Sequence, residues 1–143
     1  MTYATPADLQ AVIPDRDLKL LTDWDGIADT IDETKLQEAL DDATAEINGY
    51  IAKRASLPLS EPPRMLLVVA RDLAVYRLFA NAGRVTETQE KLRDAGITYL
   101  EKVADGELSI GDETGGDEEP TSPGVVMEEG PERVMTRESL ERF

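Results

Sequence analysis

The segment PRMLLVVARDLAVYRLFANA, residues 63–82, constrains the fold more than any other part of this chain. Prolines stand at its start and Gly83 follows its end, a pattern typical of a helix with a defined beginning and a defined stop. Apolar side chains cover most of its circumference instead of one stripe. Such a helix lies at the centre of a bundle, or is partly covered by another subunit.

The apolar positions of this helix fall into two groups. The first is a stripe that we expect to face the core: Met65, Leu66, Val69, Leu73 and Tyr76. The second spreads beyond that stripe and includes Phe79. From this wider face we take five residues as a candidate subunit interface: Leu67, Val68, Arg71, Val75 and Leu78.

Two short helices are expected near the start of the chain. Thr5 can serve as the N-cap of the first, with Pro6 at the first helical position and Asp8 in the first turn. Pro14 closes that helix. A second short helix then begins at Pro14 or Asp15 and carries Leu18 and Leu21 on one side.

Two longer helices complete the expected body. From Thr34 to about Arg54 an apolar stripe follows the 3.6-residue period: Leu36, Leu40, Ala43, Ile47, Tyr50 and Ile51. The segment SLPLSEPP ends this helix as an extended connector. The last helix is expected from Thr86 to Ala104, stopped by Gly106, and we expect its buried line to be Leu92, Ala95, Gly96, Tyr99 and Val103.

The composition changes after Gly106. Between Asp105 and Glu132 there is no Lys or Arg, and Asp, Glu, Gly and Pro dominate. Such a composition does not offset the entropy lost on ordering. We therefore expect a helical body over residues 1–106 and an acidic flexible arm over 107–143. The expected fold class is all-α, a small bundle of about four to five helices. The long acidic arm is expected to be mostly extended and to form short strands on binding.

The arm ends in RVMTRESLERF, residues 133–143, which is basic and apolar after a long acidic stretch. A frayed terminus is polar throughout, so this segment indicates a docking function. Its first part suits a short strand and its last part a helical turn. The candidate partner-binding residues are Arg133, Val134, Met135, Thr136, Arg137, Leu140 and Phe143.

Catalytic and metal chemistry find little support in the sequence. The chain has no Cys and no His, which excludes thiol catalysis, the usual zinc sites and His-dependent acid–base catalysis. The acidic stretch DWDGIADTIDE fails as an EF-hand loop from Asp23, because Gly26 is fourth and Thr34 twelfth. We interpret it as a linker anchored by Trp24. No enzyme activity, cofactor or metal is expected.

The formal net charge of −15 restricts the partners of the chain. An acidic surface repels nucleic acid, and it keeps free subunits apart unless localised apolar patches overcome the repulsion. No run of about 18 apolar residues and no secretory signal is visible, so neither a membrane span nor a membrane partner is expected. An assembly protein with a docking arm fits these properties.

Several motifs together resemble the phage Mu-like head-tail connector family. Its members were long described only as phage proteins of unknown function, and the resemblance implies the role of a neck adaptor. The motifs are YATPADL, DLKLLTD, ALDDATAEINGYIAKRASLPL, ARDLAVYRLF and RVMTRESLERF, in this order. They cover nearly the whole chain.

The resemblance implies a compact helical protein of the virion neck, assembled in the host cytoplasm. Such adaptors form a ring, typically of twelve subunits, under the portal protein. They bind the portal above and a stopper or tail-completion protein below, while double-stranded DNA passes through the channel without specific binding.

Two other classes of protein remain open. A small acidic inhibitor that mimics DNA would also be helical and negatively charged, and it would compete with DNA for a host enzyme. An enzyme is the third reading, and it would need a buried carboxylate with a raised pKa in a cleft.

Overall fold

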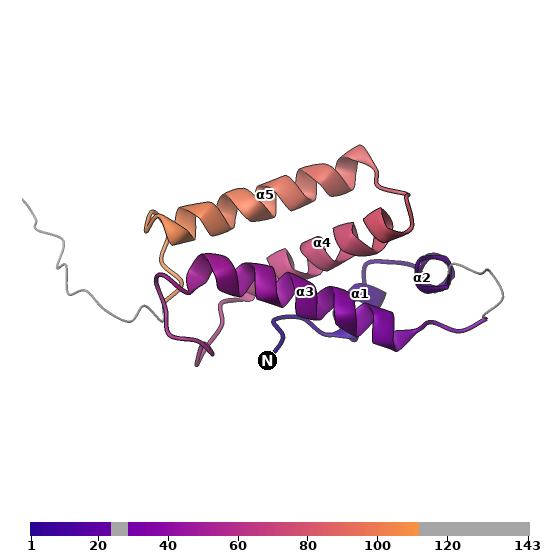
Figure 1. Cartoon of the computed structure of the whole chain (residues 1–143), viewed down its shortest axis with the longest axis horizontal. Coiled ribbons are helices and arrows are strands. Elements are labelled where there is room, and N and C mark those ends of the chain that lie inside the picture. Colours follow the sequence, from indigo (N-terminus) through magenta and orange to yellow (C-terminus); the bar gives the residue numbers. More distant parts are fainter. Residues whose placement is uncertain (24–28, 112–143) are drawn as a thin grey trace, which may run out of the picture.

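A computed structural model of the chain describes residues 1–23 and 29–111, and these residues form five α-helices (Figure 1). The helices are α1 (Pro6–Gln10), α2 (Asp15–Thr22), α3 (Glu33–Ile51), α4 (Arg64–Asn81) and α5 (Glu87–Ala104). Within those ranges no residue belongs to a strand. The expectation of a small all-α bundle is confirmed.

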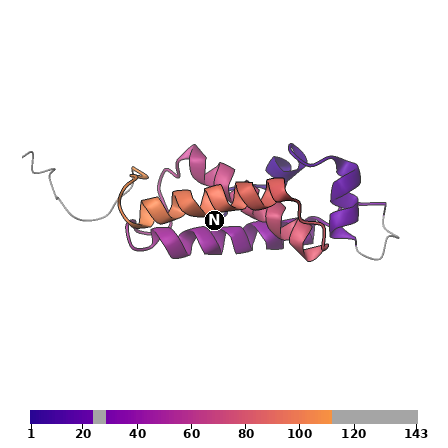
Figure 2. The same ribbon diagram turned by 90° about the horizontal axis from the view of Figure 1, so that it is seen from above.

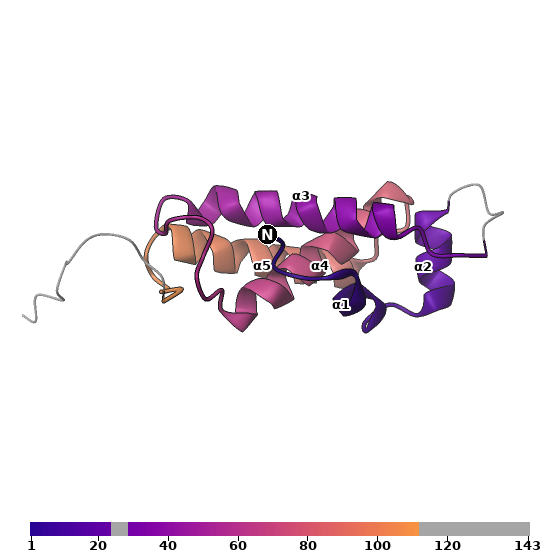
Figure 3. The same cartoon turned by 90° about the horizontal axis from the view of Figure 1, so that it is seen from below.

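Helices α3, α4 and α5 lie side by side along the long axis of the molecule, and the two short helices cover one end (Figures 1 and 2). From below, α1 lies against α3 and α4, and α2 runs across the end of the bundle (Figure 3). Helix α4 contacts all four other helices, which accounts for its broad apolar surface. It is the central helix that its composition predicted.

The ends of the helices follow from local signals. Asp32 caps α3, and its Oδ1 accepts the backbone N–H of Thr34 at 3.0 Å. Thr86 precedes α5, and its backbone N–H donates to Oε1 of Gln89 at 2.8 Å. Gly83 ends the α4 region with a φ of +67°, a conformation that favours glycine.

The stripe expected on α3 is confirmed as core. Leu36, Leu40, Ala43, Ile47 and Ile51 are fully buried, whereas Tyr50 is half-buried at the edge. On α4, the buried line consists of Leu66, Val69, Ala70, Leu73, Ala74 and Leu78. Spacings of three and four residues keep this line on one side of the helix.

Met65 was expected in the core and is 43 % exposed. It lies about 100° round the helix from Leu66, in the first turn of α4. The buried line through Leu66, Val69 and Leu73 therefore excludes it. Tyr76, expected on the same stripe, is half-buried.

Helix α5 also differs from its expected pattern. Gly96 and Val103 are buried as expected and Tyr99 is half-buried, but Leu92 and Ala95 are exposed. Leu100, which the expected line omitted, is fully buried. Gly96 sets the packing, because a β-carbon there would lie 3.3 Å from Cγ1 of Val69 on α4. The two helices therefore pack closely at Gly96, and Leu100 follows one turn later.

The core cluster extends past α5 to Ile110. The division into a body of residues 1–106 and an arm of residues 107–143 stays a prediction, since residues 112–143 lie outside the described residues. The same holds for strands in the arm and for the anchoring role of Trp24.

Candidate functional site

The wider face of α4 was the expected subunit interface, and the structure divides its five residues. Leu78 is only 3 % exposed and belongs to the chain's own core, so it is not available to a partner. Its position continues the buried line of Leu73 and Ala74, which the sequence did not separate from the wider face. Leu67, Val68, Arg71 and Val75 are half-buried and stay candidate contacts.

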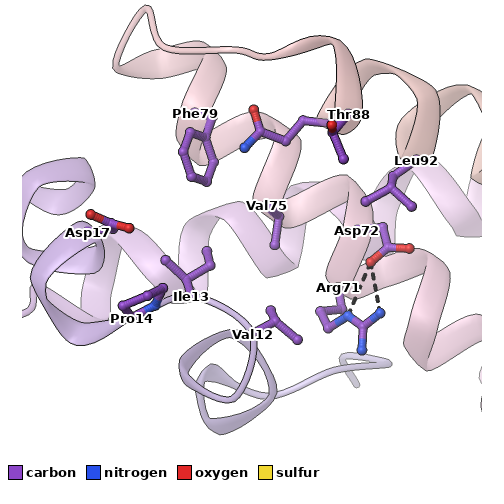
Figure 4. A pocket seen from close by; sticks show the side chains of 11 residues that line it. Val12, Ile13, Pro14, Asp17, Arg71, Asp72, Val75, Phe79, Thr88 and Leu92 are labelled. Atoms are coloured by element: carbon purple, nitrogen blue, oxygen red, sulfur yellow. Dashed lines mark hydrogen bonds and ion pairs between the residues drawn. The ribbon is translucent and has the colours of Figure 1, made fainter.

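Two of these residues, Arg71 and Val75, line a groove between three elements of the fold (Figure 4). The connection from α1 to α2 contributes Val12, Ile13 and Pro14 to one wall. Val75 and Phe79 of α4 stand in the middle, and Leu92 of α5 lies on the opposite wall. The hollow has a volume of about 290 Å³, at the lower end of the range for ligand pockets.

The groove exposes large apolar side chains. Val12 is 46 % exposed and Leu92 is 45 % exposed, and both are among the most exposed apolar residues of the described chain. Single exposed apolar residues are ordinary on a protein surface. Two of them on facing walls of one apolar hollow form a continuous patch, which is the kind of surface that binds another polypeptide.

The polar side of the groove is an ion pair within α4. Nε and Nη2 of Arg71 donate to Oδ1 of Asp72 at 3.1 Å and 3.0 Å. Because the two side chains neutralise each other, they fix the shape of this side without adding net charge. Asp17 of α2 adds an exposed carboxylate to the lining.

Other arginines stabilise the body away from the groove. Arg77 of α4 donates to Oε2 of Glu46 on α3 at 2.8 Å and lies 3.7 Å from Oδ2 of Asp42. Arg54 places its guanidinium against Gly106, whose φ of +80° and lack of a β-carbon leave room for it. The contacts of Arg77 join α4 to α3, and the contact of Arg54 joins the segment after α3 to the segment after α5.

Among residues 1–23 and 29–111, three groups have shifted pKa values, and none of the three lines the groove. Burial raises the pKa of Tyr3, whose hydroxyl donates to Oδ1 of Asn48 at 2.6 Å, and burial also raises the pKa of Tyr99. The backbone N–H of Thr5 lowers the pKa of Asp8 by donating to its Oδ2 at 2.7 Å. Each shift follows from packing or capping.

Residues 1–23 and 29–111 contain no group of three or more His, Cys, Asp or Glu side chains placed to hold a metal ion. Over the same ranges, none of the helices combines the length and the apolar character that crossing a membrane requires.

The candidate docking segment, residues 133–143, lies outside the described residues. The roles expected for Arg133, Val134, Met135, Thr136, Arg137, Leu140 and Phe143 therefore stay predictions.

Comparison with known proteins identifies relatives over nearly the whole chain. The family model described as "Bacteriophage Mu, Gp36" matches residues 3–129. The chain belongs to the bacteriophage Mu Gp36 family. The match ends before Arg133, so the candidate docking segment lies outside it.

Two relatives extend this family assignment. The Mu-like prophage FluMu protein gp36 of Haemophilus influenzae is 32 % identical over 124 residues, covering 85 % of this chain and 86 % of the relative. Gene product J of Escherichia phage Mu is 31 % identical over 138 residues, covering 96 % of each chain. The chain is thus similar in length and sequence to proteins of Mu-like phages and prophages.

The groove is not evident from the sequence, because its residues come from three separate segments. Val12 was not assigned to any face, and Leu92 was assigned to the core. A signal was nevertheless present, since Val12, Phe79 and Leu92 are among the apolar side chains that remain once the buried stripes of the helices are removed.

Proposed function

We propose that this chain is a head-tail connector of a Mu-like phage, a neck adaptor that assembles as a ring under the portal protein. In this role it links the DNA-filled head to a stopper or tail-completion protein. Its function is structural and requires no catalysis or cofactor. The virion neck is then its final location.

The proposal rests most on an apolar groove exposed on a small acidic body that belongs to a Mu-like phage family. Subunits with a net charge of −15 repel one another, so they associate only through localised apolar contacts. The groove and the half-buried residues Leu67 and Val68 of α4 supply such contacts. Repeated around a ring, weak contacts of this kind become strong.

The charge also suits a channel for DNA. A ring of twelve such subunits would carry a formal charge on the order of −180. A negative wall repels the phosphate backbone and so does not hold the DNA that moves past it.

The alternative of a DNA mimic is less well supported. Such an inhibitor needs rows of carboxylates that are free to take the place of phosphates. On α3 and α5, Glu46 is paired with Arg77 and Glu87 is paired with Lys91 at 2.7 Å.

Removal of residues 133–143 tests the proposal. We expect the truncated chain to keep its helical circular dichroism spectrum and to lose binding to the purified portal protein. A matched control shuffles residues 112–122, which keeps length, charge and the terminal segment. Unchanged portal binding by the truncated chain would show that the segment is not the docking element.

A further inference from the structure

We propose that the groove between the α1–α2 connection, α4 and α5 is the docking site for residues 133–143 of the same chain in the free subunit. This inference goes beyond the proposed function, because it concerns the subunit before assembly and does not depend on portal binding. It is carried by the shape of the groove, the length of chain that follows Gly111, and the distribution of charge.

The groove can accept the anchors that the segment offers. Its volume of about 290 Å³ equals roughly ten water molecules at about 30 Å³ each, enough for one or two large apolar side chains. Leu140 and Phe143 are three residues apart, so in a helical turn they share one side. Val12, Val75 and Leu92 would receive them, and the exposed apolar area on both walls would be covered.

The chain is long enough to bring the segment to the groove. The groove lies beside the second half of α4 and the first turns of α5, whereas the described chain ends beyond the other end of α5 (Figure 1). From Leu92 to Ala104 the helix rises about 18 Å. The 21 residues from 112 to 132 span about 70 Å when fully extended.

The same length favours docking within one chain. A flexible linker of 21 residues has a root-mean-square span of about 25 Å, close to the distance it must cover. Effective concentration is highest when linker length matches span, and it reaches the millimolar range. In dilute solution a segment held in this way reaches its own groove before that of a second subunit.

Charge distinguishes the segment from the rest of the chain. Residues 1–111 contain 12 basic and 20 acidic side chains, a net charge of −8. Residues 112–132 contain eight acidic side chains and no basic one, whereas residues 133–143 contain three arginines and two glutamates. The terminal segment is the only one of these three stretches with a positive net charge, so the acidic body attracts it. Asp17 at the groove provides a carboxylate for Arg137.

Docking of this kind would shield the apolar segment on the free subunit until a partner displaces it. Covered anchors reduce contact between free subunits. When a partner displaces the segment, the groove is uncovered at the same time. Both surfaces then become available for assembly together.

Cysteine cross-linking tests the proposal directly, because the chain has no cysteine of its own. In the full-length chain, Leu92→Cys is combined with Leu140→Cys, and the rate of disulfide formation under mild oxidation is measured. A disulfide needs Cα atoms within about 7 Å of each other. We expect an intramolecular disulfide, seen as a monomer with altered mobility on a non-reducing gel.

The control combines Met65→Cys with Leu140→Cys. Met65 is 43 % exposed, nearly the same as Leu92 at 45 %, but it does not line the groove. It lies in the first turn of α4, toward the end of the bundle where the described chain ends, so an undocked tail would meet it at least as often (Figure 1). We expect cross-linking to Leu92→Cys to be at least about tenfold faster than to Met65→Cys.

Equal rates for the two pairs would overturn the proposal. Cross-links between two chains, increasing with protein concentration, would also overturn it and would identify a second copy as the source of the segment. If Leu92→Cys disturbs folding by circular dichroism, Val12→Cys on the other wall replaces it with the same expected result. Failure here would leave the proposed connector function standing, because that is measured by portal binding.

Discussion

The two halves of α5 each carry one leucine, but the two leucines meet different surroundings. In the second half, Gly96, Leu100 and Val103 are buried against the rest of the bundle. In the first half, Leu92 lies about three turns before Val103 on nearly the same side, yet it is nearly half exposed beside the groove. Helical periodicity therefore indicates which side of a helix is apolar. It does not indicate whether the chain itself covers that side.

Alanine substitution of one leucine in each half of α5 should give the largest difference in the free energy of unfolding. We expect Leu100→Ala to lower the free energy of unfolding by about 2–5 kcal/mol, because it leaves a cavity in a fully buried position. Leu92→Ala should change it by no more than about 0.5 kcal/mol. Urea unfolding measures both. A cost at Leu92 equal to that at Leu100 would show that the first half is also part of the core.

Substitution of Gly96 tests the close approach of α4 and α5. Gly96→Leu should lower the free energy of unfolding by about 1–3 kcal/mol, because the added side chain would press on Val69. Gly49→Leu on α3 is the matched control, since no atom lies within 4 Å of a β-carbon at that position. It should be neutral or slightly stabilising in the same urea titration, because leucine has the better helix propensity. A neutral Gly96→Leu would contradict the packing described for the second half.

The first half of α5 depends more on capping than on burial. Thr86→Ala should cost about 1 kcal/mol, because Thr86 precedes the helix as its N-cap residue. We expect the loss to appear mainly as faster hydrogen exchange at residues 87–91, with little change near Leu100. Uniformly faster exchange along α5 would show that its two halves unfold as one unit.

Protonation of Asp8 should have the smallest effect. Its folded-state pKa is lowered, chiefly by the backbone N–H of Thr5, so its contribution to stability is present above the unfolded pKa of about 3.9. That contribution is lost as the pH falls through the lower folded pKa. The stability difference between the wild type and Asp8→Asn should therefore be present at pH 7 and shrink below pH ~4 in urea titrations. If the stability difference between the wild type and Asp8→Asn does not change with pH, the charge of the Asp8 carboxylate is not its cause.

Much of the fold could be predicted because local signals and long apolar stripes determine it. Pro6 and Thr86 stand at helix starts, and the stripe from Leu36 to Ile51 is buried as the 3.6-residue period requires. These features depend on neighbours in the sequence. They require no knowledge of how the helices are arranged.

The groove could not be predicted in the same way, because it depends on where helices diverge. Leu92 faces a groove formed with the α1–α2 connection and α4, and the buried Leu78 lies near Leu21 of α2 and Ala39 of α3. These segments lie far apart in the sequence. Gly96 could be predicted as buried, but its contact with Val69 follows only from the packing of two helices. The family match supports a Mu-like phage protein and leaves its docking surface to experiment.

Native mass measurement, with the chain alone and mixed with the portal protein of a Mu-like phage, tests the connector function most directly. We predict a monomer for the chain alone, because a charge of −15 keeps free subunits apart. On the portal we predict a ring with a defined number of copies of this chain. A chain that stays monomeric and unbound in the presence of the portal would contradict the proposed function.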